Sequence, residues 1–118
     1  MFPTSSRASG LRISLYVASG AFSREKCHKL AEYIEHLAVQ GWDRWVLDLS
    51  SVTHMDYRGM RRLLRTAQLL DGLGGEFRWC GMSPYLQDIA RVAGGHDRPM
   101  YRSRLDAVRG LASVALGV

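Results

Sequence analysis

The stretch Trp45-Val-Leu-Asp-Leu-Ser50, with the residues that follow it as far as Ala67, decides the fold. A short apolar run between polar residues is typical of a buried strand, and it predicts one over Trp45–Leu49. The apolar residues then change to helical spacing, which predicts a helix over Met60–Leu70. Asp56 lies between the two, where its carboxylate is well placed to cap the helix. Because α/β sheets bind ligands and partners at the carboxyl ends of their strands, this turn is the first candidate for function.

The rest of the chain repeats this order of a strand followed by a helix. Predicted strands cover Leu11–Gly20, Trp45–Leu49, Phe77–Cys80 and Met100–Tyr101, and predicted helices begin after Ser23, Asp56, Ser83 and Ser103. Glycines after these helices, such as Gly94-Gly95 after the third, mark their ends. The alternation predicts an α/β fold, with a four- or five-stranded, mostly parallel sheet flanked by about four helices.

Composition and length predict one soluble domain. The 118 residues are 47% hydrophobic and 23% charged, which suits a single core. We expect residues 1–10 to be a flexible, serine-rich segment with the option of a short edge strand, and residues 11–118 to form the domain. No apolar run approaches the roughly 18 residues of a spanning helix, and no signal peptide is evident. With two cysteines on predicted apolar faces, Cys27 and Cys80, the interpretation is a cytoplasmic protein with reduced thiols.

Several features keep the order and spacing of one known family. They are V-L-D-L-S at 46–50, M-D-x-x-G at 55–59, Gly74-Gly75, C-G-M-S-P at 80–84, and Gly94-Gly95. This pattern resembles the STAS domains, which are the anti-sigma-factor antagonists and their relatives, from about Leu11 to Leu111. The resemblance implies a sheet of four or five strands flanked by helices, and a protein partner bound at the turn after the central strand.

The same resemblance implies a phosphorylation switch whose acceptor is replaced in this chain. Phosphorylatable STAS proteins read Asp-Ser-Ser/Thr-Gly at the turn, and the first serine is the target of a kinase that is also the anti-sigma factor. This chain reads Asp56-Tyr57-Arg58-Gly59, so Tyr57 stands at the phosphoacceptor position. A phenol is too long for a site that holds a serine hydroxyl near the γ-phosphate. We therefore expect an interaction module without the usual serine switch.

The distribution of charge indicates where the predicted partner surface lies. The net charge is +5, and the one concentration of arginines follows the turn, with no acidic residue between Tyr57 and Leu70. Arg and Tyr are enriched in interface hot spots, which suits a standing contact with a protein. The alternative for these arginines is a solvated helix face. The predicted partner-binding residues are Asp56, Tyr57, Arg58, Gly59, Met60, Arg61, Arg62 and Arg65.

Other classes of function find little support. The histidines lack paired zinc spacing, the segment Gly72–Gly75 follows a helix and lacks the Lys-Ser/Thr of a phosphate loop, and no acidic pair suits a magnesium-dependent receiver. We expect no enzyme, no metal and no cofactor. For Asp48 the expectation is a strand-end carboxylate tied to backbone or solvent.

Three alternatives stay open. One is a STAS-like accessory subunit of a lipid-transport ATPase, another is a nucleotide-binding regulatory module, and the third is a homodimer. No aromatic platform interleaves with the basic positions of the helix, which argues against nucleic acid.

Overall fold

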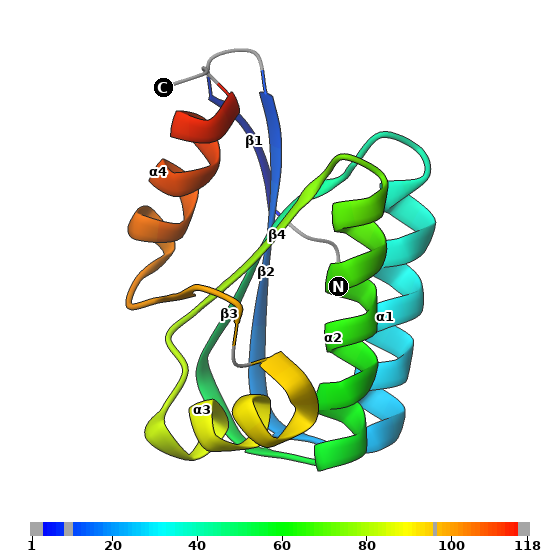
Figure 1. Ribbon diagram of the computed structural model, residues 1–118, viewed down its shortest axis with the longest axis vertical. Coiled ribbons are helices and arrows are strands. Elements are labelled where there is room, and N and C mark those ends of the chain that lie inside the picture. The colour runs from blue at the N-terminus through cyan, green and yellow to red at the C-terminus, as the bar shows by residue number, and fades with distance from the viewer. Residues whose placement is uncertain (1–3, 9–10, 96, 116–118) are drawn as a thin grey trace.

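One β-sheet organises the computed structural model, which describes residues 4–8, 11–95 and 97–115 (Figure 1). Within these ranges the strands are β1 (Thr4–Ala8), β2 (Leu11–Phe22), β3 (Arg44–Met55), β4 (Glu76–Cys80) and β5 (Met100–Tyr101). They lie in the order β1-β2-β3-β4-β5. β1 pairs with β2 in the antiparallel sense, and the other neighbours are parallel. The predicted α/β fold with a mostly parallel sheet is therefore confirmed.

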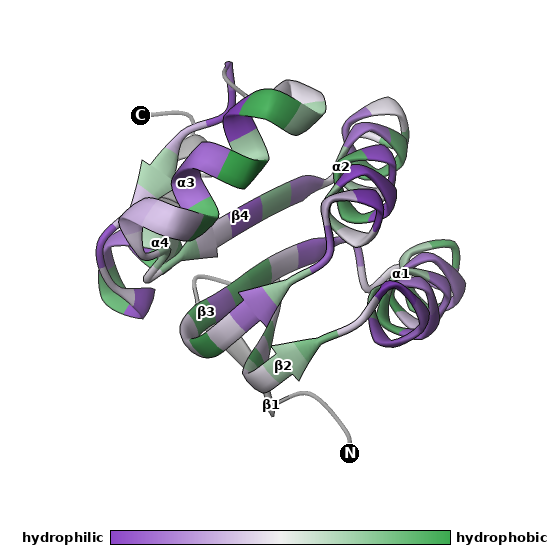
Figure 2. Cartoon of the chain, turned by 90° about the horizontal axis from the view of Figure 1, so that it is seen from below, coloured by the Kyte–Doolittle hydropathy of each residue, from purple (hydrophilic) through white to green (hydrophobic). Residues whose placement is uncertain are grey.

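Helices cover both faces of this sheet. The helices that connect the parallel strands pack on one face, and the last helix, which follows the last strand, packs on the other. They are α1 (Arg24–Ala38), α2 (Tyr57–Gly72), α3 (Pro84–Ala90), which the kinked segment η1 (Arg91–Gly95) follows, and α4 (Arg104–Ala115). α1 and α2 lie side by side on one face, whereas α4 lies on the other (Figures 1 and 2). None of the helices in the described ranges combines the length and apolarity that crossing a membrane requires.

The alternation of side chains along β3 divides the core into two parts. Trp45, Leu47 and Leu49 are buried in the larger cluster, beneath α1, α2 and α3. Val46 is buried in the smaller cluster with Ala107 of α4. A strand covered on both faces needs apolar residues at nearly every position, which explains the continuous run in the sequence. Figure 2 shows green, hydrophobic segments along the strands and along the inner sides of the helices.

Serine caps begin three of the helices as predicted. The hydroxyl of Ser23 accepts from the N–H of Lys26, that of Ser83 from Leu86, and that of Ser103 from Asp106, each at 3.2 Å. Each cap satisfies a donor that the first turn of a helix leaves free.

Three boundaries differ from the sequence expectation. β2 continues past Gly20 to Phe22, and β3 continues past Leu49 to Met55, because the two strands stay paired, with register shifts in β2, up to the pair Phe22 and Met55. The polar residues of β3 after Leu49 are exposed, which hid the strand from the apolar pattern. α3 ends at Ala90, and η1 carries the chain on to Gly94-Gly95, where Gly94 has φ 107°. Thr4–Ala8 is the edge strand that the sequence offered as an option.

Candidate partner-binding site

The candidate site begins where α2 follows β3 at the carboxyl edge of the sheet. Asp56 is the single residue between the two elements. Its backbone N–H donates to the carbonyl of Phe22 at 3.1 Å, and its Oδ1 accepts from the N–H of Arg58 at 2.7 Å. Asp56 is therefore the N-cap that the sequence predicted, and it holds the start of α2 against the end of β2.

An exposed surface begins at this first turn and continues along α2. Tyr57 is 41% exposed, and its ring centre lies 5.9 Å from the guanidinium carbon of Arg61, one turn further along α2. This is a cation–π contact, which positions both side chains. Arg58 and Arg65 are also exposed. We call this surface the α2 tip, and it consists of Asp56, Tyr57, Arg58, Arg61 and Arg65.

Two predicted contact residues point inward instead. Met60 is fully buried in the larger core cluster, and Gly59 is buried as well. A Cβ added at Gly59 would lie 2.6 Å from the Sγ of Cys27, so this glycine lets α1 approach α2 closely. Gly59 and Met60 thus position the α2 tip, but the prediction that Met60 contacts a partner is wrong because its side chain does not reach the surface.

The thiol of Cys27 lies in this close approach. Burial, with a smaller effect from the charge of Asp56, raises the pKa of Cys27 to about 11. The thiol is therefore protonated at neutral pH and acts as a small apolar side chain.

Arg62 has a structural partner that the sequence analysis did not assign. Its guanidinium forms two hydrogen bonds to the carboxylate of Glu35 on α1, with Nη1–Oε2 2.5 Å and Nη2–Oε1 3.0 Å. The buried hydroxyl of Thr66 donates to the same carboxylate at 2.6 Å. The hydrogen bond from Arg62 lowers the pKa of Glu35 below its ordinary value. Arg62 therefore ties α2 to α1, and the acid that balances its charge comes from α1, although none lies nearby in α2.

A basic hollow lies beside the α2 tip, between α1 and α2. Its volume is about 440 Å³. The lining residues are all basic, and they are Arg24, His28, Arg58, Arg61, Arg62 and Arg65. The arginines of α2 were predicted from the sequence, but Arg24 and His28 were not, because nothing in the spacing of α1 showed that its first turns would face those of α2.

A second polar cluster occupies the other face of the sheet. Asp48 of β3 is 3% exposed, and its Oδ1 accepts from the N–H and the hydroxyl of Ser50 at 2.9 and 2.7 Å. The Nε of Arg104 on α4 donates to Oδ2. Burial opposes ionisation, but the hydrogen bonds from Arg104 and Ser50 outweigh it and lower the pKa of Asp48. The predicted tie to backbone is confirmed, but Asp48 is not at the end of its strand, because β3 continues to Met55. The ion pair to α4 is an addition that sequence spacing could not show.

His54, next to the turn, has an aromatic neighbour. Its ring stacks on that of Tyr85 from α3, with ring centres 5.5 Å apart and an angle of 24°. The hydroxyl of Tyr85 donates to the carbonyl of Met55 at 3.4 Å. Tyr85 is 42% exposed and was missed by the sequence analysis, although its place directly after Pro84 at a helix start pointed to this edge of the sheet. His54 is therefore part of an aromatic pair that flanks the turn.

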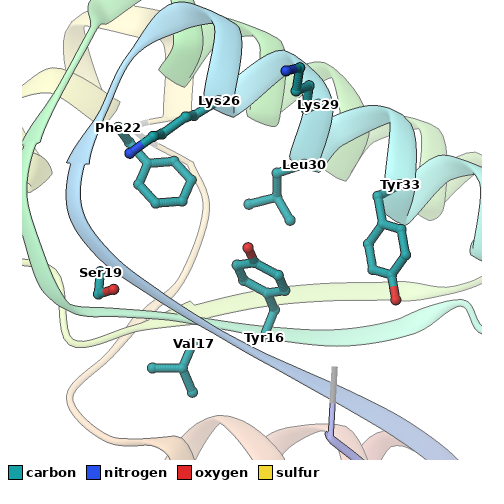
Figure 3. A pocket seen from close by; sticks show the side chains of 8 residues that line it. All are labelled: Tyr16, Val17, Ser19, Phe22, Lys26, Lys29, Leu30 and Tyr33. Atoms are coloured by element: carbon teal, nitrogen blue, oxygen red, sulfur yellow. The ribbon is translucent and has the colours of Figure 1, made fainter. Parts of the chain in front are cut away.

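A further groove of about 380 Å³ lies between β2 and α1. Figure 3 shows Tyr16, Leu30 and Tyr33 around this space. In the described residues β1 pairs with β2 only as far as Leu15, so the edge of β2 beyond that residue has no strand beside it. The Nζ of Lys26 donates to the edge carbonyl of Ala21 at 3.2 Å, which protects part of this edge from pairing with another strand.

No metal-binding cluster is found in the part of the chain that the structure describes. Within it no group of three or more His, Cys, Asp or Glu side chains could hold an ion. His96, one of the four histidines considered from the sequence, lies outside the described residues.

Comparison with solved structures shows that this chain has the fold of the anti-sigma-factor antagonists. A putative anti-sigma factor antagonist from Thermotoga maritima is similar with TM-score 0.77 and 12% identity, over 92% of this chain and 93% of that one. Moorella thermoacetica RsbS is similar with TM-score 0.73 and 16% identity, over 97% of both chains. The Bacillus cell fate determinant SpoIIAA, in its phosphorylated form, is similar with TM-score 0.70 and 14% identity, over 92% and 97%.

The family follows from a sequence comparison. A family model described as "Mlab, STAS domain" matches residues 7–102. The chain therefore belongs to the STAS domain family, as its motifs indicated. A search of curated proteins found no match.

Proposed function

We propose that this chain is a non-enzymatic STAS interaction module of the anti-sigma-factor-antagonist type, and that the α2 tip contacts its protein partner. The observation that supports this most directly is the exposed pair of Tyr57 and Arg61 at the carboxyl edge of the sheet. α/β sheets bind partners at that edge, and both residue types are enriched among interface hot spots. The cation–π contact holds the two side chains in place before binding, which lowers the entropy that binding would otherwise cost.

The proposed module differs from a phosphorylation switch. A phosphoserine at the start of a helix would add about two negative charges there. In this chain the position holds Tyr57, and Arg58 follows it, so the tip keeps a positive charge in all conditions near neutral pH. We infer that binding at the tip is not regulated by phosphorylation of a serine at this turn.

The proposed contact set is smaller than the set of residues predicted from the sequence. Met60 is buried and Arg62 is engaged with Glu35, so neither is offered as a direct contact. The proposed contacts are Tyr57, Arg58, Arg61 and Arg65, with Asp56 shaping the turn. On this proposal, the protein takes part in cytoplasmic signalling that controls transcription.

A second candidate has the same surface and a different partner. The description of the matching family model, "Mlab, STAS domain", names no partner protein. The alternative raised from the sequence, an accessory subunit of a lipid-transport ATPase, is therefore retained. The two candidates predict the same residues at the interface, and they differ only in the protein bound there.

Site-specific cross-linking in the native host separates these candidates. The photoreactive residue p-benzoylphenylalanine would replace Tyr57 in one strain, and Leu105, which is 57% exposed on α4, in a control strain. We expect one protein to be cross-linked from position 57 and not from position 105. An anti-sigma factor supports the first candidate, and an ATPase subunit supports the second. The same products from both positions, or none from position 57, would show that the α2 tip is not the interface.

A further inference from the structure

The basic hollow carries charge that the described part of the protein leaves uncompensated. Two of its six basic side chains have acidic partners, because Arg62 binds Glu35 and His28 lies 2.6 Å from Glu32. The other four form no salt bridge with any residue in the described ranges, and they are Arg24, Arg58, Arg61 and Arg65. Four guanidinium groups that share one concave surface repel one another, and an anion between them would relieve that repulsion.

The backbone adds to this positive field. α1 and α2 both begin at the carboxyl edge of the sheet (Figure 1), and their first turns are in close contact, since a Cβ at Gly59 would lie 3.5 Å from the Cα of Arg24. The N-terminal ends of helices carry partial positive charge, which favours anions. The first turn of α2 contains no acidic residue, although Asp56 caps this turn and Glu25 lies in the first turn of α1, so the field of the helix ends is a smaller contribution than the four arginines.

The shape of the hollow limits what the anion can be. Arg58 and Arg65 are seven residues apart, so they lie about 10 Å apart along α2 at 1.5 Å per residue. One phosphate or sulfate would contact both Arg58 and Arg65 only if their long side chains converged on it, whereas a short chain of phosphates can contact them as they extend from the helix, and this favours the longer anion. The lining contains no aromatic or aliphatic side chain that could hold a nucleobase, and its volume of about 440 Å³ suits a small molecule.

We propose that this hollow is a binding site for a compact, soluble polyphosphate, recognised through its phosphate groups alone. Guanidinium groups donate two parallel hydrogen bonds to phosphate oxygens, which makes arginine the side chain best suited to this task. Arg62 is held in place by Glu35 and Thr66, so it forms a rigid side of the site. The site does not depend on the protein partner proposed above, although its ligand and that partner would compete for Arg58, Arg61 and Arg65.

Isothermal titration calorimetry on the full chain in 150 mM NaCl tests this site. The probes are tripolyphosphate, ATP and sulfate. We expect one tripolyphosphate per chain, with affinity at least tenfold above that of sulfate and within about threefold of that of ATP. The double variant Arg24→Gln with Arg61→Gln removes two charges from the hollow, and it should weaken tripolyphosphate binding at least tenfold. The matched control, Arg102→Gln with Arg109→Gln, removes two exposed charges elsewhere and should change affinity less than twofold.

Three results would overturn the proposal. The first is an equal loss of affinity in both double variants, which would mean diffuse attraction to a basic protein. The second is the absence of saturable binding of tripolyphosphate, with circular dichroism showing native protein. The third is ATP binding more than tenfold tighter than tripolyphosphate, which would require recognition of the base. None of these results bears on the cross-linking from position 57, so the site and the proposed interface can fail separately.

Discussion

The carboxylate of Glu35 on α1 and the guanidinium of Arg62 on α2 form a two-hydrogen-bond ion pair that joins the two helices beside the candidate site. Their side chains are only 25% and 19% exposed, so water screens the pair less than it screens a surface pair. The pair fixes the relative position of the helices whose first turns form the basic hollow. A residue that the sequence suggested as a partner contact is therefore a support for the site.

Loss of this ion pair should reduce stability. Glu35→Gln leaves the half-buried guanidinium of Arg62 without its counter-charge, and hydrogen bonds to charged groups contribute about 1.5–3 kcal/mol to stability. We expect a loss of about 1–3 kcal/mol in the free energy of unfolding, measured by urea denaturation at pH 7. The same substitution at Glu32, whose pair with His28 is exposed, is the control, and it should cost less than about 1 kcal/mol. Equal losses would mean that the pair with Arg62 has no special role.

The contribution of Glu35 should also depend on pH. The hydrogen bond from Arg62 lowers the pKa of Glu35 in the folded protein below the ordinary value of 4.5, so the unfolded chain takes up this proton first as pH falls. The stabilisation is therefore complete above the ordinary pKa and is lost as pH falls through the lowered one. We expect the difference in unfolding free energy between wild type and Glu35→Gln to shrink from pH 6 to pH 3. A difference that stays constant over this range would contradict the assigned cause.

The close approach of α1 and α2 at Gly59 should tolerate no side chain. In Gly59→Ala the new methyl group would lie 2.6 Å from the Sγ and 2.8 Å from the Cβ of Cys27, so the helices must separate. Overpacking of this kind costs about 1–3 kcal/mol. Gly72→Ala is the control, because its Cβ meets nothing within 4 Å and alanine favours the helix, so stability should stay the same or rise. Thermal unfolding of both variants measures this, and a stable Gly59→Ala variant would show that the contact adapts.

Charge reversal at the α2 tip should weaken binding of the partner that cross-linking identifies. Arg58→Glu with Arg61→Glu is expected to lower affinity at least tenfold, which is about 1.4 kcal/mol, with the unfolding midpoint nearly unchanged because both side chains are exposed. Arg62 is left intact, since its reversal would break the pair with Glu35.

The control for this prediction reverses two exposed arginines elsewhere, Arg102 and Arg109. Arg104 is avoided because it binds Asp48. Binding is measured by surface plasmon resonance at 150 mM salt. If the two double variants lose affinity equally, attraction is diffuse and the interface is not localised at the α2 tip.

Local patterns in the sequence were sufficient to predict the elements and their order. The apolar run Trp45–Leu49, the caps Ser23 and Asp56, and Ser83-Pro84 act over a few residues, through hydrogen bonds and burial that each segment specifies for itself. The end of β3 was predicted at Leu49, which is short of its actual end at Met55. The exposed polar residues after Leu49 form a strand because they pair with β2, and their own pattern does not indicate one. The turn, and the presence of Tyr57 at the phosphoacceptor position, could likewise be predicted from the sequence alone.

Tertiary structure alone decided which side chains of the turn and of α2 reach the surface. Helical periodicity places Met60 and Arg62 on particular sides of α2, but only the packing of α1 against α2 buries the first and pairs the second with Glu35, 27 residues away. The same packing brings Arg24 and His28 to the arginines of α2, and folding of α4 over the sheet brings Arg104 to Asp48. These are long-range contacts between segments whose local patterns are independent, so no spacing along the chain encodes them; the sequence determined the parts of the site, and the approach of the helices determined its charge and shape.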